Sequence, residues 1–141
     1  MGEIQVSDEV IIEDMIYEIR GMQVMLDSDL AKLYKCVNGT KTINQAVNRH
    51  LDRFPEDFYF QLTNVELMNL QSQVGTANIS AMTRTLPYAF TEQGVAMLAT
   101  ILRTNVASKI SVSIMRAFVA MKNIVHFLLF NYYKYGLFII I

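Results

Sequence analysis

The stretch DSDLAKLYKCVNGTKTINQAVNRHLDRF, residues 27–54, decides the fold expected for this chain. It is typical of two short helices joined by a turn. We expect the first helix to run from Asp29 to about Tyr34, with Asp27 or Ser28 as its N-cap, because a side-chain oxygen there can accept hydrogen bonds from the first free amides. Its short apolar stripe consists of Leu30, Ala31 and Leu33.

The second helix is expected to start near Thr40, after the turn Cys36–Gly39. The Asn-Gly pair in this turn tolerates positive φ. Apolar and weakly polar residues then recur at spacings of three and four, which places them on one face of a helix. They are Ile43, Val47, His50, Leu51 and Phe54. Pro55 ends the helix, since the residue before a proline is pushed out of the α region.

The opposite face of this second helix is polar and contains no acid before Asp52. Its residues are Lys41, Thr42, Asn44, Gln45, Asn48, Arg49 and Arg53. Asn and Gln can pair with adenine, Arg with guanine, and both Lys and Arg with phosphate. We therefore predict a DNA-contacting surface, flanked by Lys35 and Arg84. The alternative is a solvated face without a ligand, although such faces more often alternate Glu and Lys.

Alternating residues predict strands on both sides of this unit. Met15–Leu26 is expected to form a β-hairpin that turns at Arg20-Gly21, with a helix over Ile11–Ile19 as the competing interpretation. Phe58–Leu62 alternates as a strand with one buried face. A short strand at Tyr88–Phe90 is expected to pair back to it.

Capping signals predict three more helices. Thr63 and Glu66 have the spacing of a capping box, so a helix should run from there to about Ser72. Thr91 should cap a helix over residues 92–103, and a last helix should start after Asn105 or Ser108. Between them, Gly75–Thr85 is expected to be a loop. The fold class expected is α+β: an N-terminal β-hairpin, a helix-turn-helix-like core with a small winged antiparallel sheet, and two C-terminal helices.

Charge and composition divide the 141 residues into three parts. Residues 1–30 carry a net charge of −7 and residues 31–141 a net charge of +6, so the total of −1 hides a basic body. We expect an acidic arm at 1–12, one domain at 13–123 and an apolar tail at 124–141. The single cysteine, Cys36, and the absence of a secretory signal fit a cytoplasmic protein.

The last helix and the tail are apolar enough to contact a second copy of the chain or a membrane. Ile110–Val125 carries a broad apolar stripe that suits either the core or a homodimer seam. The tail approaches the ~20 apolar residues that span a bilayer. Polar residues interrupt it, namely His126, Asn131 and Lys134, so a membrane span is disfavoured. Packing into the domain, or a truncated or shifted reading frame, explains the tail better.

The residue inventory argues against an enzyme. His50 and His126 lie far apart in the sequence, and the chain has no metal-ligand spacing, phosphate-cradling glycine loop or cysteine–histidine pair. Glu92 and Asp57 are explained by capping and turn roles. We therefore expect no catalytic residue, no metal and no cofactor.

Four blocks of sequence together resemble the phage-regulatory ORF-six-N domain family, a relative of the KilA-N and Bro-N modules of phages and large DNA viruses. The resemblance covers about residues 13–123. The blocks are MLDSDLAKLY (Met25–Tyr34), INQAVNRHLDRFPEDFYFQLT (Ile43–Thr63), LPYAFTEQGVAML (Leu86–Leu98) and IMRAFVAMK (Ile114–Lys122).

The resemblance implies a small α+β domain that binds double-stranded DNA and regulates transcription in phages, prophages or bacteria. Some relatives look like antirepressors, so the alternative function is a protein-interaction module that acts on a repressor protein. The family usually continues into a further helix or domain, where this chain has its apolar tail. It supplies no established base-contacting residues, so the predicted DNA contacts come from the helix face alone.

Overall fold

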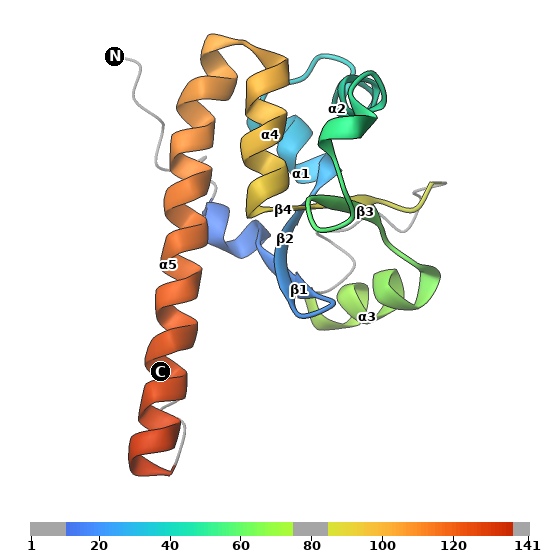
Figure 1. Ribbon diagram of the computed structural model, residues 1–141. Coiled ribbons are helices and arrows are strands. Elements are labelled where there is room, and N and C mark those ends of the chain that lie inside the picture. Colours follow the sequence, from blue (N-terminus) through green and yellow to red (C-terminus); the bar gives the residue numbers. More distant parts are fainter. Residues whose placement is uncertain (1–10, 75–84, 137–141) are drawn as a thin grey trace.

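The computed structural model describes residues 11–74 and 85–136, and they form an α+β fold (Figure 1). Its sheet consists of β1 (Tyr17–Ile19), β2 (Met22–Leu26), β3 (Tyr59–Gln61) and β4 (Tyr88–Thr91). The helices are α1 (Asp27–Leu33), α2 (Thr40–Asn48), α3 (Asn64–Val74), α4 (Glu92–Leu102) and α5 (Asn105–Tyr135). Two short 3-10 helices, η2 (Ile12–Met15) and η3 (Leu51–Arg53), complete the described elements.

The four strands pair antiparallel in the order β1-β2-β4-β3. The predicted hairpin is confirmed, and its turn residues Arg20 and Gly21 both have positive φ, at 57° and 72°. The predicted pairing of β3 with β4 is confirmed as well, with Phe60 opposite Ala89. β4 also pairs with β2, which makes it an inner strand.

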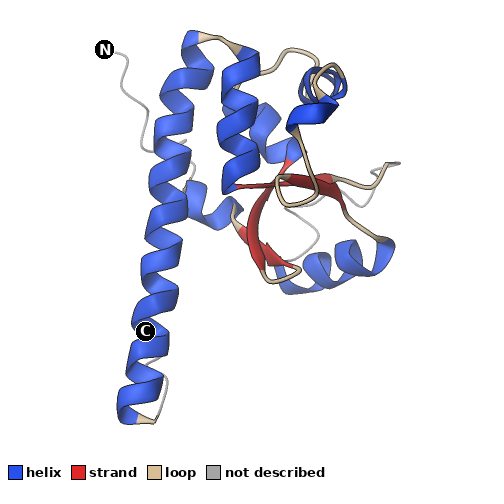
Figure 2. Ribbon diagram, viewed as in Figure 1, coloured by secondary structure: helices blue, strands red, loops and turns tan. Residues whose placement is uncertain are grey.

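Helices cover both faces of the sheet (Figure 2). On β2 and β4, Met25 and Phe90 point to one face, where α1, α2, α4 and α5 build the larger core. Their neighbours Val24 and Ala89 point to the other face, which Leu70 of α3 covers. The period of two along each strand therefore divides the apolar residues between two cores.

Side-chain capping sets where three helices begin. The capping box at α3 is confirmed: the Glu66 amide donates to Thr63 Oγ1 over 3.1 Å, and the Thr63 amide donates to Glu66 Oε1 over 2.9 Å. Thr91 caps α4 through the Gly94 amide. Thr104 caps α5 through the Ala107 amide. Arg103 has a left-handed conformation, ends α4 and lets α5 turn back along it.

The two central helices differ from their predicted bounds. α1 starts at Asp27 rather than Asp29, and neither Asp27 nor Ser28 is its N-cap. α2 ends at Asn48 because His50 leaves the helical conformation (φ −138°, ψ 41°), and η3 follows. This break turns Leu51 to solvent while Phe54 still reaches the core. The prediction that Leu51 faces the core is therefore wrong.

α5 continues well beyond the rest of the domain (Figures 1 and 2). Ile114 and Phe118 of the predicted stripe are buried against the domain, and Ile110 and Met121 pack partly against the same core. Val125 is exposed, as are Ile124, Phe127, Leu129, Phe130, Tyr133 and Tyr135. The expectation that the tail packs into the domain is therefore not met by these exposed residues, although Asn131 is buried and its Nδ2 donates to the Phe127 carbonyl of the same helix. We call residues 123–135 the α5 overhang.

By length and composition α5 is apolar enough to cross a membrane, a test that core helices of soluble proteins also pass. Its first half packs against α4 and η2. Lys122 of α5 forms an ion pair with Glu92, the first residue of α4. α4 therefore packs along α5 up to about Lys122, and the α5 overhang lies beyond that point.

Candidate nucleic-acid interface

Four predicted site residues share one exposed side of α2. Lys41, Gln45, Asn48 and Arg49 are spaced by three and four, and all four are exposed. Ile43 and Val47, on the opposite side, are fully buried. We call Lys41, Gln45, Asn48 and Arg49 the α2 face.

The α2 face is held in place by the core beneath it. Ile43 and Val47 pack in the same cluster as Leu30 of α1 and Leu98 of α4. α4 lies between α5 and the α1–α2 pair (Figure 1). The α2 face therefore belongs to a helix that is anchored on its inner side and open to solvent on its outer side.

The α2 face is electrostatically unpaired within the described part of the chain. The two ion pairs found there are Arg20–Glu66 and Lys122–Glu92, and neither involves α2. Among the described residues, neither Lys41 nor Arg49 takes part in a side-chain hydrogen bond or an ion pair. Both cations thus remain available to an anionic partner.

The other predicted residues occupy different positions. Lys35 is exposed in the turn before α2, with φ 57°, and Thr42 is half-buried beside the α2 face. Arg53 is exposed on η3, not on α2, because the helix breaks at His50. Arg84 and the predicted loop around it lie outside the described residues.

Asn44 is placed differently from the prediction. Its Nδ2 donates a hydrogen bond to Asp27 Oδ2 over 3.1 Å, so its amide points into the domain. Its Oδ1 is buried without a hydrogen-bond partner among the described residues. Asn44 lies at the border between the α2 face and the core, and its side chain is occupied by Asp27.

Two buried acids, Asp27 and Asp29, lie in the first turn of α1. Burial raises the pKa of Asp27, and the hydrogen bond from Asn44 together with backbone hydrogen bonds to Tyr88 and Ser28 opposes that rise. Burial also raises the pKa of Asp29, to about 6, while Lys32 opposes the rise and Asp27 adds to it. No local spacing in the sequence links Asp27 with Asn44, so sequence reasoning missed this contact.

Aromatic rings of β3, of β4 and of the segment after η3 pack against one another. Tyr59 and Tyr88 stack with ring centroids 4.9 Å apart, and Phe54 and Phe90 contact the Tyr59 ring edge-on or tilted. Burial and the neighbouring Tyr88 raise the pKa of Tyr59 to about 12. Tyr59 therefore stays neutral at physiological pH.

A separate groove of about 390 Å³ lies between α5, the β1–β2 hairpin and the start of α4. Its lining carries both signs of charge, with the carboxylates of Glu18, Asp57 and Glu92 and the ammonium of Lys122. Within residues 11–74 and 85–136, no group of three His, Cys, Asp or Glu side chains could hold a metal ion. The groove shares no lining residue with the α2 face.

The fold and this helix face define a small α+β domain with an antiparallel sheet, helices on both of its faces, and one exposed basic and amide-rich helix. The model of the ORF6N domain matches residues 14–101, more than half of the chain, and the chain belongs to this phage-associated regulatory family. The match runs from η2 to the end of α4 and stops before α5. No curated protein and no solved structure matched the chain.

Proposed function

We propose that this protein is a DNA-binding regulatory protein of phage or prophage type that binds duplex DNA through α2. The observation that carries the proposal is the α2 face, where two cations that form no ion pair within residues 11–74 and 85–136 flank two exposed amide side chains. Membership of a phage-associated regulatory family supports it. In this proposal α1, the turn and α2 act as a helix-turn-helix-like unit, and the protein works in the cytoplasm.

The side chains divide into two roles by their chemistry. Lys41 and Arg49 contact phosphates, with Lys35 and Arg53 as flanking cations. Gln45 and Asn48 contact base edges in the major groove, because an amide can both donate to and accept from adenine. Thr42 lies beside them and can reach either type of group.

Salt dependence tests the phosphate contacts. Each neutralised phosphate contributes roughly −0.9 to the slope of log K against log salt concentration. Lys41→Ala/Arg49→Ala should therefore weaken binding and flatten the slope by about 2. The matched control is Lys109→Ala/Arg116→Ala, which removes two exposed charges from α5. Equal slopes for the wild type and the α2 variant would contradict the assigned roles.

The second candidate function is an antirepressor-like module that binds a repressor protein. The α5 overhang favours it, because clustered exposed apolar side chains are typical of protein contacts. Co-purification with a repressor that is lost in Phe127→Ser/Phe130→Ser at concentrations where the wild type is also a monomer, without binding to duplex DNA at low salt, would favour this function over the first.

A further inference from the structure

Asp27 joins three elements of the domain. It begins α1, directly after β2, and is only 5% exposed. A carboxylate in such a place is costly unless hydrogen bonds compensate for its lost hydration. Its partners are the Asn44 amide on α2 and the backbone of Tyr88 on β4 and of Ser28. Asp27 is thus bound to α1, to β4 and to α2.

The Asp27–Asn44 hydrogen bond differs in kind from the other contacts that hold α2. Ile43 and Val47 anchor the helix through apolar packing, which is not directional. A hydrogen bond weakens steeply when its angle departs from linearity, so it restricts rotation of α2 about its axis. Asn44 precedes Gln45 and lies one turn before Asn48, so its rotation moves both.

We propose that the Asp27–Asn44 pair sets the angle at which α2 presents the α2 face, which makes Asn44 a positioning residue rather than a base-contacting one. The inference rests on the proposed function, since the orientation matters through DNA binding. It goes beyond that function by assigning a specific task to a buried acid and to an amide that does not reach the DNA.

Exchanging the two side chains tests the pair. Asn44→Ala should weaken binding to specific and nonspecific duplexes by a similar factor, about tenfold, with an unchanged salt slope because no phosphate contact is lost. The double variant Asp27→Asn/Asn44→Asp should regain most of the affinity, because its amide and its carboxylate have only traded places and can form the same hydrogen bond. Asn44→Asp alone should bind more weakly than this exchange variant, since two carboxylates would then face each other.

Asn48→Ala is the matched control. Asn48 is exposed one turn further along, and its loss should change the preference among duplex sequences without loosening the helix. If Asn44→Ala changes the preference at one base position and leaves nonspecific binding intact, Asn44 contacts a base and the inference is wrong. A folded exchange variant that binds no better than Asn44→Ala would also overturn it.

Hydrogen exchange supplies a readout that does not need DNA. Asn44→Ala should raise the amide exchange rates of residues 44–48 and leave those of β2 and β4 unchanged, and the double variant should restore them. Unchanged amide exchange in α2 would overturn the inference even if the wild type binds DNA. Wild-type protein that fails to bind duplex DNA would refute the proposed function, whereas the amide exchange data would still decide whether the pair holds α2.

Discussion

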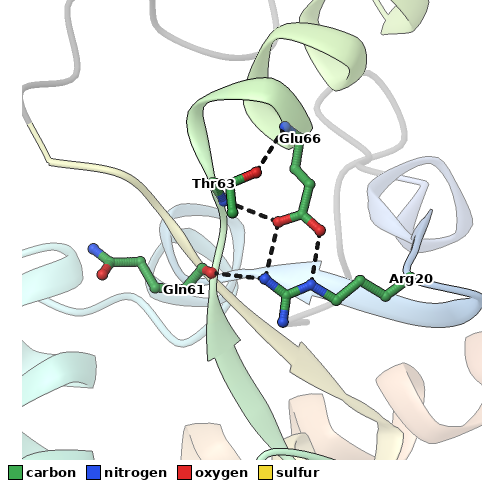
Figure 3. A network of polar contacts seen from close by, with 4 residues as sticks. All are labelled: Arg20, Gln61, Thr63 and Glu66. Atoms are coloured by element: carbon green, nitrogen blue, oxygen red, sulfur yellow. Dashed lines mark hydrogen bonds and ion pairs between the residues drawn. The ribbon is translucent and has the colours of Figure 1, made fainter.

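Arg20 and Glu66 lie 46 positions apart in the sequence and form a two-bonded ion pair, with Nε–Oε2 at 2.7 Å and Nη2–Oε1 at 3.0 Å (Figure 3). Arg20 is a turn residue of the β1–β2 hairpin, and Glu66 belongs to the capping box of α3. The guanidinium also lies 4.0 Å from the centre of the Phe60 ring and donates to the Gln61 carbonyl. Arg20 thereby links the turn between β1 and β2 to α3, the helix that covers the Val24 and Ala89 face of the sheet.

Removing this pair should make the stability of the protein less dependent on pH. The hydrogen bond from Arg20 holds the pKa of Glu66 at about 2, below its ordinary value. A lowered folded-state pKa contributes stability that is present above about pH 4.5 and is lost as the pH falls toward 2. Glu66→Gln should lower the free energy of unfolding at pH 7 by about 1 kcal/mol, since the pair is partly exposed.

Urea denaturation at pH 7 and pH 3 checks this prediction, with Glu18→Gln as the control on the exposed side of β1. The difference between Glu66→Gln and the wild type should shrink at pH 3. A difference that is the same at both pH values would show that the ion pair does not contribute.

Gly94 should not tolerate a side chain. A Cβ at this position would lie 1.9 Å from the Phe58 carbonyl oxygen, which already accepts a hydrogen bond from the Thr91 amide. Because backbone must move to relieve the clash, Gly94→Ala should lower the free energy of unfolding by about 3 kcal/mol. Ala96→Gly, on the exposed side of α4, should cost only about 1 kcal/mol. Thermal unfolding that ranks the two variants in the opposite order would contradict the close packing of α4 on Phe58.

Asp29 should destabilise the protein at neutral pH. Burial raises the pKa of Asp29 to about 6, above the value near 4 in the unfolded chain. The contribution of Asp29 to the free energy of unfolding is therefore most favourable below about pH 4 and is lost as the pH rises through 6. Asp29→Asn should therefore raise the free energy of unfolding at pH 7 by on the order of 1–2 kcal/mol relative to the wild type. Denaturation at pH 7 and pH 4 measures the effect, and a stabilisation no larger at pH 7 than at pH 4 would contradict it.

The α5 overhang should mediate pairing of two copies of the chain. Phe127, Phe130 and Tyr133 are 50%, 57% and 80% exposed. An aromatic side chain has a surface of about 150–250 Å². At their exposed fractions, these three side chains and Tyr135 together leave roughly 500 Å² open to solvent. Ile124, three residues before Phe127, extends the side of α5 on which Phe127, Phe130 and Tyr133 recur. Lys134 lies over the Phe130 ring and is a cation that a lipid phase would disfavour.

Sedimentation velocity over a range of concentrations tests this pairing. Phe127→Ser/Phe130→Ser should shift the protein toward monomer, whereas Val112→Ser, at an exposed position on the covered half of α5, should not. Concentration-independent monomer in the wild type would contradict the pairing. Partition of the wild type into lipid vesicles would instead assign the overhang to a membrane.

Much of the fold could be predicted from local signals. The Arg20-Gly21 turn, the Thr63–Glu66 capping box and the Thr91 cap are each fixed by neighbouring residues, and all three are confirmed. The pairing of β4 with β2 was not predicted, because it joins segments more than 60 positions apart and leaves no periodicity in the sequence. The end of α2 was also missed, since residues 49–54 keep helical spacing while the backbone at His50 does not.

For the candidate site, the sequence predicted which residues could share a helix face but not their partners. Lys41, Gln45, Asn48 and Arg49 share an exposed face as the period of 3.6 requires. Asn44 lies at the edge of that face, where a helical wheel cannot distinguish a solvent-facing amide from one bound to the core. The deciding contact is Asp27, which tertiary packing brings to it.

The most direct test of DNA binding through the α2 face is a fluorescence-anisotropy titration of duplex DNA at low and moderate salt. The wild type is compared with Gln45→Ala/Asn48→Ala, with Lys109→Ala/Arg116→Ala as the control. The wild type should bind in a salt-dependent manner with a preference among sequences, and the Gln45/Asn48 variant should bind with that preference lost. Folded wild-type protein that does not bind at low salt would contradict the account, as would a variant that keeps the full sequence preference.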